Sequence, residues 1–155
     1  MLKQIIGCLV SLIPLVAYAD KTQKLTPKEQ QLIIATLAQD CVLSLTTGSS
    51  ELAWVKPESS PTNQEDFCLN EAKNKTNSLD IPVSKMTISE QEVAVGAIVL
   101  AKFLPKNSQC YKSFFNQPCR NDLQKMSKDT SLALKFRNYR DVIVKNYGLD
   151  VELFK

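Results

Sequence analysis

Four cysteines beyond residue 40 constrain the fold of this 155-residue chain more than any other feature. They are Cys41, Cys68, Cys110 and Cys119, whereas the fifth cysteine, Cys8, lies in an N-terminal apolar stretch. Zinc sites usually combine close cysteine pairs with histidine, but this chain has no histidine and its closest pair is C-x8-C. It also lacks the C-x-x-C motif of thiol redox proteins. The even number of cysteines therefore favours two structural disulfides.

The spacing of the four cysteines leaves three pairings open. Cys110 and Cys119 flank the short segment YKSFFNQP, and we expect them to bridge each other. Cys41 and Cys68 would then form the second bridge, between two helices. A loop as short as that between Cys110 and Cys119 gives a stabilisation at the low end, roughly 2–3 kcal/mol. We expect the main effect of this bridge to be on the shape of residues 111–118.

The N-terminal stretch predicts export. It has one lysine, Lys3, then an apolar run from Ile5 to Val16, and it closes with the small-x-small pattern Ala17-Tyr18-Ala19. This pattern predicts a secretory signal peptide, residues 1–19, cleaved after Ala19. A transmembrane anchor is the alternative, but the apolar run is shorter than the ~20 residues that span a bilayer. We expect residues 20–155 to be periplasmic or secreted, without stable membrane insertion.

Two helices are predicted from start signals in the first half of the chain. The segment Thr26–Glu29 has an N-cap threonine, a proline at the first helical position and a glutamate three residues after the cap. The helix that follows should end at Gly48, with Cys41 on its apolar face. We expect the second helix to begin at Thr62, with Glu65 as its capping partner.

The third element is predicted from a cap and an apolar run. Ser89 and Glu92 match a capping box, and Ile88 and Val93 are placed to pack across it. The run VAVGAIVLAKFL, residues 93–104, is compatible with a buried helix or a buried strand, and periodicity cannot separate the two. The cap and the length of the run favour a helix, whose single glycine would allow a neighbouring helix to approach closely.

The chain after Cys119 predicts a basic helical region that breaks near residues 127–129. Residues 102–155 carry 11 basic and 5 acidic side chains, whereas residues 20–101 carry 7 and 11. The basic side chains are spaced along a helix face rather than clustered, so the pattern does not favour nucleic-acid binding. An apolar stripe recurs at steps of three and four residues: Leu132, Phe136, Tyr139, Ile143 and Tyr147.

These elements predict an all-α fold, a single small helical domain of four to five helices stapled by two disulfides. The chain shows no alternation of strands and helices that would indicate a parallel sheet. Residues 48–61 are rich in glycine, serine and proline and predict a loop. In that loop we expect Trp54 to be a core or loop anchor rather than a ligand platform.

The sequence gives little support for catalysis. Without histidine, a Ser-His-Asp or Cys-His arrangement is impossible. No nucleotide-binding, metalloprotease or EF-hand motif occurs, so we expect no metal and no cofactor. Glu65-Asp66 and the pair Glu90 and Glu92 match a carboxylate hydrolase by residue type only, because acidic residues also suit the first turn of a helix. We therefore expect a protein that is not an enzyme.

The bridged loop and the last helix hold the residues that we assign to partner binding. An exposed phenylalanine on a pinned loop is a favourable anchor for a protein partner, and the alternative is that both rings pack in the core. The basic face of the last helix supplies two further candidates. The assigned residues are Tyr111, Phe114, Phe115, Asn116, Lys135 and Arg137.

By analogy with small exported, disulfide-bonded helical proteins, we expect a protein-binding module in the periplasm. Its specific form would be an inhibitor or immunity protein against a hydrolase that targets the cell envelope. An accessory factor or chaperone for the envelope or for secretion is the alternative, with promiscuous binding or oligomerisation through residues 93–104. A carboxylate-based hydrolase is the third possibility, and it requires two acidic side chains that converge in a cleft.

Overall fold

The computed structural model describes residues 19–48 and 62–155. The predicted leader up to Tyr18 and the predicted anchor Trp54 lie outside the described residues. Within the described ranges the chain forms five α-helices and four short 3-10 turns, and no strand. The all-α prediction is confirmed, and so are the two disulfides, Cys41–Cys68 and Cys110–Cys119.

Helix α1 (Pro27–Thr47) begins and ends as predicted. The Thr26 hydroxyl accepts a hydrogen bond from the Glu29 amide, and the Glu29 carboxylate accepts one from the Thr26 amide at 2.7 Å. Gly48 ends the helix in the left-handed conformation, with φ 73°, which glycine adopts without steric cost. One face of α1 is fully buried, and its largest apolar residues are Leu32, Ile33, Leu37 and Cys41.

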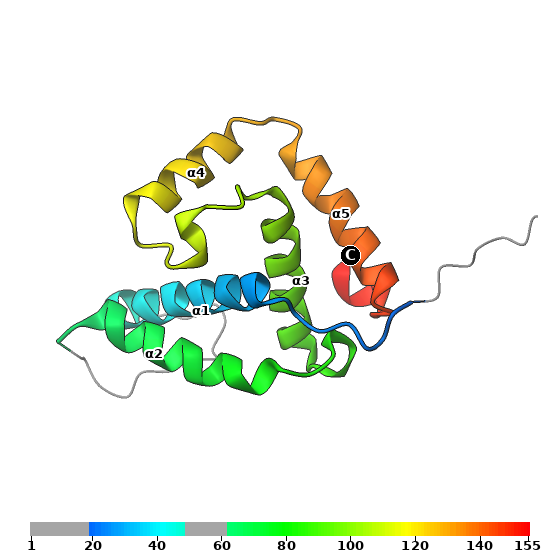
Figure 1. Cartoon of the computed structure of the whole chain (residues 1–155), viewed down its shortest axis with the longest axis horizontal. Helices are drawn as coiled ribbons and strands as arrows, with labels where there is room; N and C mark the ends of the chain where they lie inside the picture. The colour runs from blue at the N-terminus through cyan, green and yellow to red at the C-terminus, as the bar shows by residue number, and fades with distance from the viewer. Residues whose placement is uncertain (1–18, 49–61) are drawn as a thin grey trace, which may run out of the picture.

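Helix α2 (Gln64–Thr76) runs back along α1, as Figure 1 shows. The buried Cys41–Cys68 disulfide joins the two helices, with 5.6 Å between the Cα atoms. The predicted cap at Thr62 is wrong by one residue, because Asn63 caps the helix and accepts from the Asp66 amide. Asparagine ranks above threonine at this position, and the Asn63 amide group also donates to the Asp66 carboxylate at 2.6 Å.

Helix α3 (Ile88–Phe103) follows two 3-10 turns, η1 (Asn77–Leu79) and η2 (Val83–Lys85), and confirms the helical alternative for the apolar run. In Figure 1 it crosses the α1–α2 pair instead of lying along it. Its buried face meets the core cluster and consists of small and medium apolar residues: Ala94, Val95, Ala97, Ile98 and Val99.

The predicted capping box of α3, Ser89 with Glu92, is wrong by two residues. Thr87 is the cap, and the Glu90 carboxylate accepts a hydrogen bond from the Thr87 amide at 2.8 Å. Both frames match the capping pattern, but the observed frame buries Met86, which is 5% exposed. Ile88 becomes the first helical residue and is 54% exposed, so it does not act as the predicted staple.

Helices α4 (Gln117–Ser127) and α5 (Leu132–Asn146) form an arch over α3 (Figure 1). The break between them lies at residues 128–131, where it was predicted. Turn η3 (Gln109–Tyr111) precedes α4 and provides its main contact, while turn η4 (Val151–Phe154) follows α5 and packs against it.

The predicted apolar stripe of α5 faces the body of the protein. Its residues Leu132, Phe136, Tyr139, Ile143 and Tyr147 are all buried or half-buried. Phe103, the last residue of α3, stacks against two of them, with ring centroids 4.9 Å from Phe136 and 6.0 Å from Tyr139. These aromatic pairs fix the position of α5 relative to α3.

Among the helices of the described ranges, none is long and apolar enough to cross a membrane.

The two disulfides should differ in their contribution to stability. Replacing Cys41 and Cys68 together by alanine opens a crosslink with a sequence separation of 27 residues, and chain entropy predicts a loss of about 3–4 kcal/mol in the free energy of unfolding. The same change at Cys110 and Cys119, nine residues apart, should cost about 2–3 kcal/mol. Urea unfolding of both double variants measures the difference, and the opposite order would contradict the entropic account.

Candidate functional site

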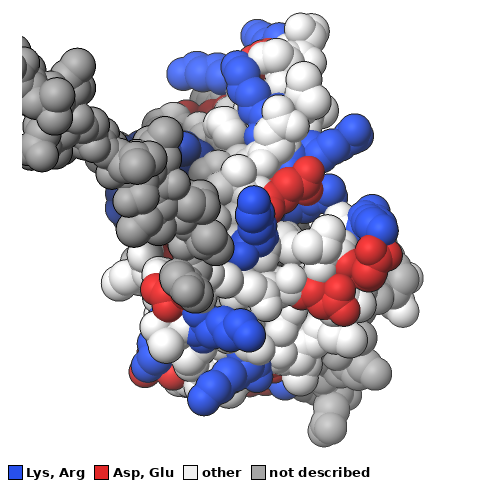
Figure 2. All heavy atoms as spheres, turned by 90° about the vertical axis from the view of Figure 1, so that its right-hand side faces the viewer, with Lys and Arg blue, Asp and Glu red and all other residues white. Residues whose placement is uncertain are grey.

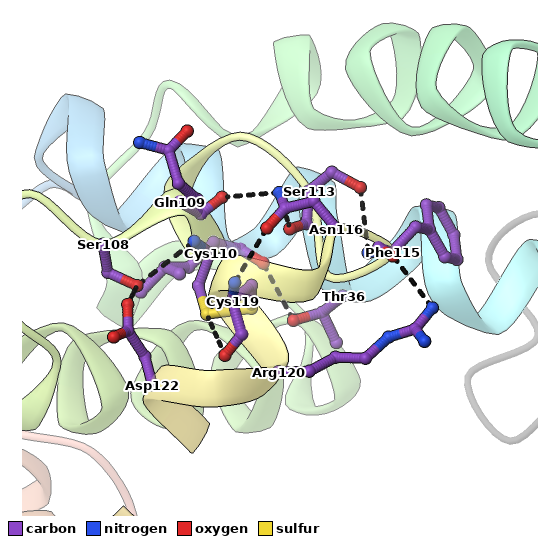
Figure 3. The surroundings of a disulfide bond; sticks show 11 residues. Thr36, Ser108, Gln109, Cys110, Ser113, Phe115, Asn116, Cys119, Arg120 and Asp122 are labelled. Atoms are coloured by element: carbon purple, nitrogen blue, oxygen red, sulfur yellow. Dashed lines mark hydrogen bonds between the residues drawn. A yellow bond between two sulfur atoms is a disulfide. The ribbon is translucent and has the colours of Figure 1, made fainter. Parts of the chain in front are cut away.

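The Cys110–Cys119 bridge holds a compact loop at the start of the arch (Figure 3). Both sulfur atoms are fully buried, and the two Cα atoms are 4.6 Å apart. Asn116 closes the loop from inside. Its side-chain oxygen accepts from the Cys119 amide at 2.8 Å, and its nitrogen donates to the carbonyl oxygens of Gln109 and Ser113. The predicted site residue Asn116 therefore shapes the loop and caps α4.

The aromatic residues of the loop are largely turned toward the protein. Tyr111 is 9% exposed, and its pKa is raised by burial and by the nearby Glu29 carboxylate. Phe114 and Phe115 are both half-buried against the core cluster. They therefore lie between the two alternatives that the sequence left open, the exposed anchor and the fully packed pair.

The two predicted residues on α5 are exposed and differ in their partners. The Lys135 ammonium binds the Asp129 carboxylate at 2.7 Å. The Arg137 side chain forms no hydrogen bond or ion pair with any of the described residues. The bridged loop packs on α1 through η3, whereas α5 packs on α3. The structure therefore places the six predicted residues in two separate parts of the fold, the bridged loop beside α4 and the helix α5 (Figure 1).

An open groove of about 440 Å³ lies between α3 and α5. We call it the α3–α5 groove. Its apolar lining comes from both helices and from η4 at one end, and its members are Val95, Gly96, Val99, Leu100, Ala133, Phe136 and Phe154. Its charged lining residues are Glu92 on α3 and Arg137 and Arg140 on α5.

The charges of the groove stand on opposite walls. Arg140 binds the neighbouring Asp141 carboxylate at 3.0 Å, in an exposed pair that contributes little to stability. Like that of Arg137, the side chain of Glu92 has no hydrogen bond or ion pair with the described residues. No ion pair thus crosses the groove within the described ranges. The groove offers apolar surface together with one acidic and two basic groups, an arrangement that suits a ligand with both characters.

Gly96 lies in the apolar lining of this groove. Apart from its chain neighbours and the nearby backbone of α3 itself, a Cβ atom added to Gly96 would meet no atom of the described chain within 4 Å, and the backbone there does not require glycine. The sequence predicted that this glycine would allow the close approach of a helix. None of the described segments occupies the space over it, so the backbone of α3 is open to a binding partner at this point.

Figure 2 shows the side of the molecule on which α5 lies. Lysine and arginine side chains are interspersed there with acidic and uncharged ones, and they do not form one continuous basic surface. This distribution fits the recognition of a partner of mixed character better than the non-specific binding of a polyanion, which requires clustered positive charge.

A second groove, between α4, α5 and the end of α3, is a weaker candidate. Its acidic residues are already engaged, because the Asp122 carboxylate accepts from the Ser108 hydroxyl at 2.6 Å and Asp129 binds Lys135. Two of the four carboxylates considered for hydrolysis serve helix starts, since Asp66 accepts from the capping residue Asn63 and Glu90 accepts from the Thr87 amide at the start of α3. No group of metal-binding side chains occurs among the described residues.

Comparisons with protein-family models, with curated proteins and with solved structures found no match for this chain. The functional argument therefore depends on the geometry of the α3–α5 groove. Of its charged residues, only Arg137 is predicted from the sequence to bind a partner, whereas Glu92 is predicted as part of a cap and as a carboxylate candidate by residue type. The available signal was the position of Arg140, which lies four residues after Phe136 and three after Arg137 and is therefore a neighbour of each on the helix surface.

Substitution of Gly96 by alanine should stabilise the protein. Alanine is the better helix former by up to about 1 kcal/mol, and its Cβ atom enters open space. Urea unfolding should show this gain, whereas Gly48→Ala, at φ 73°, should lower the stability. A loss of stability at Gly96→Ala would indicate that the groove is filled.

Asp129 should make the stability of the α4–α5 turn depend on pH in the acidic range. Hydrogen bonds from Lys135 and Ser131 lower the pKa of this carboxyl from 3.8 to about 2. Because the pKa is lower in the folded state, the stabilisation is present above pH ~4 and is lost as the pH falls toward 2. The stabilities of the protein and of Asp129→Asn, measured by urea unfolding, should therefore converge as the pH falls from 5 to 2. A difference that stays constant with pH would refute this role.

Proposed function

We propose that this chain is an exported protein-binding module whose contact surface centres on the α3–α5 groove. The observation that carries the proposal is the groove itself, an open apolar surface in which no described segment covers Gly96 and the side chains of Arg137 and Glu92, on its two walls, pair with no described residue. Exposed apolar surface that is rimmed by polar groups is typical of interaction sites. The charged rim adds specificity and steers the encounter with a partner.

A rigid body favours tight binding by such a groove. The Cys41–Cys68 and Cys110–Cys119 disulfides hold α2 to α1 and α4 to η3, so little conformational freedom remains to be lost on binding. Residues 102–155, which include α5, carry a net charge of +6, which attracts an acidic partner. The specific form that we propose is an inhibitor or immunity protein against an envelope-targeting hydrolase.

Three observations support export. The leader pattern of residues 1–19 is the first, and two disulfides, compatible with a periplasmic or extracellular protein, are the second. The third concerns Asp20, whose amide donates to the Asn146 carbonyl oxygen at 2.7 Å in the last turn of α5. Cleavage after Ala19 would place a free ammonium group at the negative end of this helix, a favourable interaction of about 0.3–1 kcal/mol.

Site-specific cross-linking in the source organism tests the proposal. A photoreactive amino acid is placed at Ala133, an exposed residue of the groove, and in a control at Asn74, an exposed residue of α2. We expect one cross-linked protein from Ala133 and none from Asn74. The intact mass of the recovered protein should correspond to a chain that begins at Asp20. Equal cross-linking from both positions, or none from Ala133, would refute a binding function for the groove.

The identity of the cross-linked protein distinguishes the forms of this function. A single partner that is a hydrolase, and that loses its activity when the purified protein is added, supports the inhibitor or immunity role. A diffuse set of unfolded proteins supports the accessory factor or chaperone instead. Recovery of the protein with residues 1–19 still attached would contradict cleavage after Ala19.

A further inference from the structure

We infer that the α3–α5 groove accepts an amphipathic α-helix of a partner protein, with acidic side chains along one flank of its apolar face. This inference rests on the proposed binding function and specifies the partner's chemistry. It is carried by three features of the groove: its shape along α3, the open backbone at Gly96, and the uneven charge of its walls.

The shape of the groove matches a helix in length and in surface. On α3, Glu92, Gly96 and Val99 lie at steps of four and three residues, so they form one stripe along the groove. Ile88 continues this stripe by one turn and is 54% exposed. From Ile88 to Val99 the stripe is about 16 Å long, which three turns of a partner helix cover.

The open backbone at Gly96 favours a helix as the occupant. Because an added Cβ atom meets no other described segment within 4 Å, a partner can approach the α3 backbone more closely here than at any residue with a side chain. Helix-in-groove recognition requires such an apolar floor, on which partner residues at i, i+3, i+4 and i+7 rest. Phe136 on α5 and Phe154 of η4 supply the aromatic surface beside it.

The charges on the two walls of the groove determine which flank of the partner helix is acidic. Arg137 and Arg140 lie three residues apart on α5, so carboxylates spaced by one turn on a partner helix can reach both. Glu92 on the facing wall disfavours a second acidic flank and accepts a lysine or a neutral residue. A fatty acid carries a single anionic group and therefore complements only one of the two walls. Two walls of opposite charge suit a helix better, because its two flanks can carry different side chains.

A peptide selection tests this inference on the purified, oxidised full chain. Random peptides of about 16 residues, long enough for marginal helix formation, are selected in parallel against the protein and against Gly96→Phe. We expect the peptides that enrich only on the protein to show apolar residues at helical spacing with Asp or Glu on one flank. Their circular dichroism should become helical on binding.

Variants locate the binding of the selected peptides. Gly96→Phe fills the groove and Arg137→Glu reverses the charge of one wall, so each should weaken binding about tenfold or more. Gly96→Phe is used only after its thermal unfolding shows a folded protein, and Ala133→Phe serves as a second groove-filling variant. Lys112→Glu, the same charge reversal at an exposed residue outside the groove lining, should leave the affinity unchanged.

Several results would overturn the inference. They are peptides that enrich equally on Gly96→Phe, peptides without helical spacing, and no enrichment at all. A dimer in solution that Gly96→Phe dissociates would assign the groove to a second copy, and laurate binding that both groove-filling variants abolish, without a peptide, would assign it to an acyl chain. Cross-linking from Ala133 that persists in any of these cases would leave the proposed binding function standing while refuting the helical partner.

Discussion

The buried crosslink between α1 and α2 is the constraint on which the rest of the structure depends. Cys41 lies in the middle of α1, and Cys68 lies one turn into α2, so the bond fixes two antiparallel helices side by side. The α1 helix also packs against α3 and against η3. Once α1 and α2 form a rigid layer, α3 crosses it and the loop at η3 rests on it. The arch of α4 and α5 is then held through both of its helices.

The open groove follows from the way in which the arch is held. At its start, the Cys110–Cys119 bridge ties α4 to η3, and in the first half of α5 the rings of Phe136 and Tyr139 pack on Phe103. Phe103 is the last residue of α3, so this contact joins α5 to one end of that helix. Farther along α3, the distance between the helices is filled only in part, and Gly96 contributes no side chain to it. The result is a groove rather than a continuous interface.

Local signals predicted the helices well, and long-range packing decided what they left open. The proline after Thr26 marks a single possible start for α1, and that start was correct. Before α3, two overlapping capping patterns begin at Thr87 and at Ser89, and only the burial of Met86 in the tertiary structure selects the first. The groove joins residues 92–100 with residues 133–140 and with Phe154, and no local pattern predicts that contact. The sequence indicated Arg137 because it is a basic residue on the polar face of the last helix, but it did not indicate the groove in which Arg137 lies.

The presence of glycine at position 96 has no explanation within the described chain. In the interior of a helix, glycine is less favourable than alanine by about 1 kcal/mol, and neither a left-handed φ nor a close neighbour requires it here. The side chains of Arg137 and Glu92, on the two walls beside it, likewise pair with none of the residues that the structure describes. Each feature alone is ordinary for a protein surface, but together they occur at one apolar groove between two fixed helices. A partner backbone that approaches Gly96 and carries charges to both walls accounts for all three.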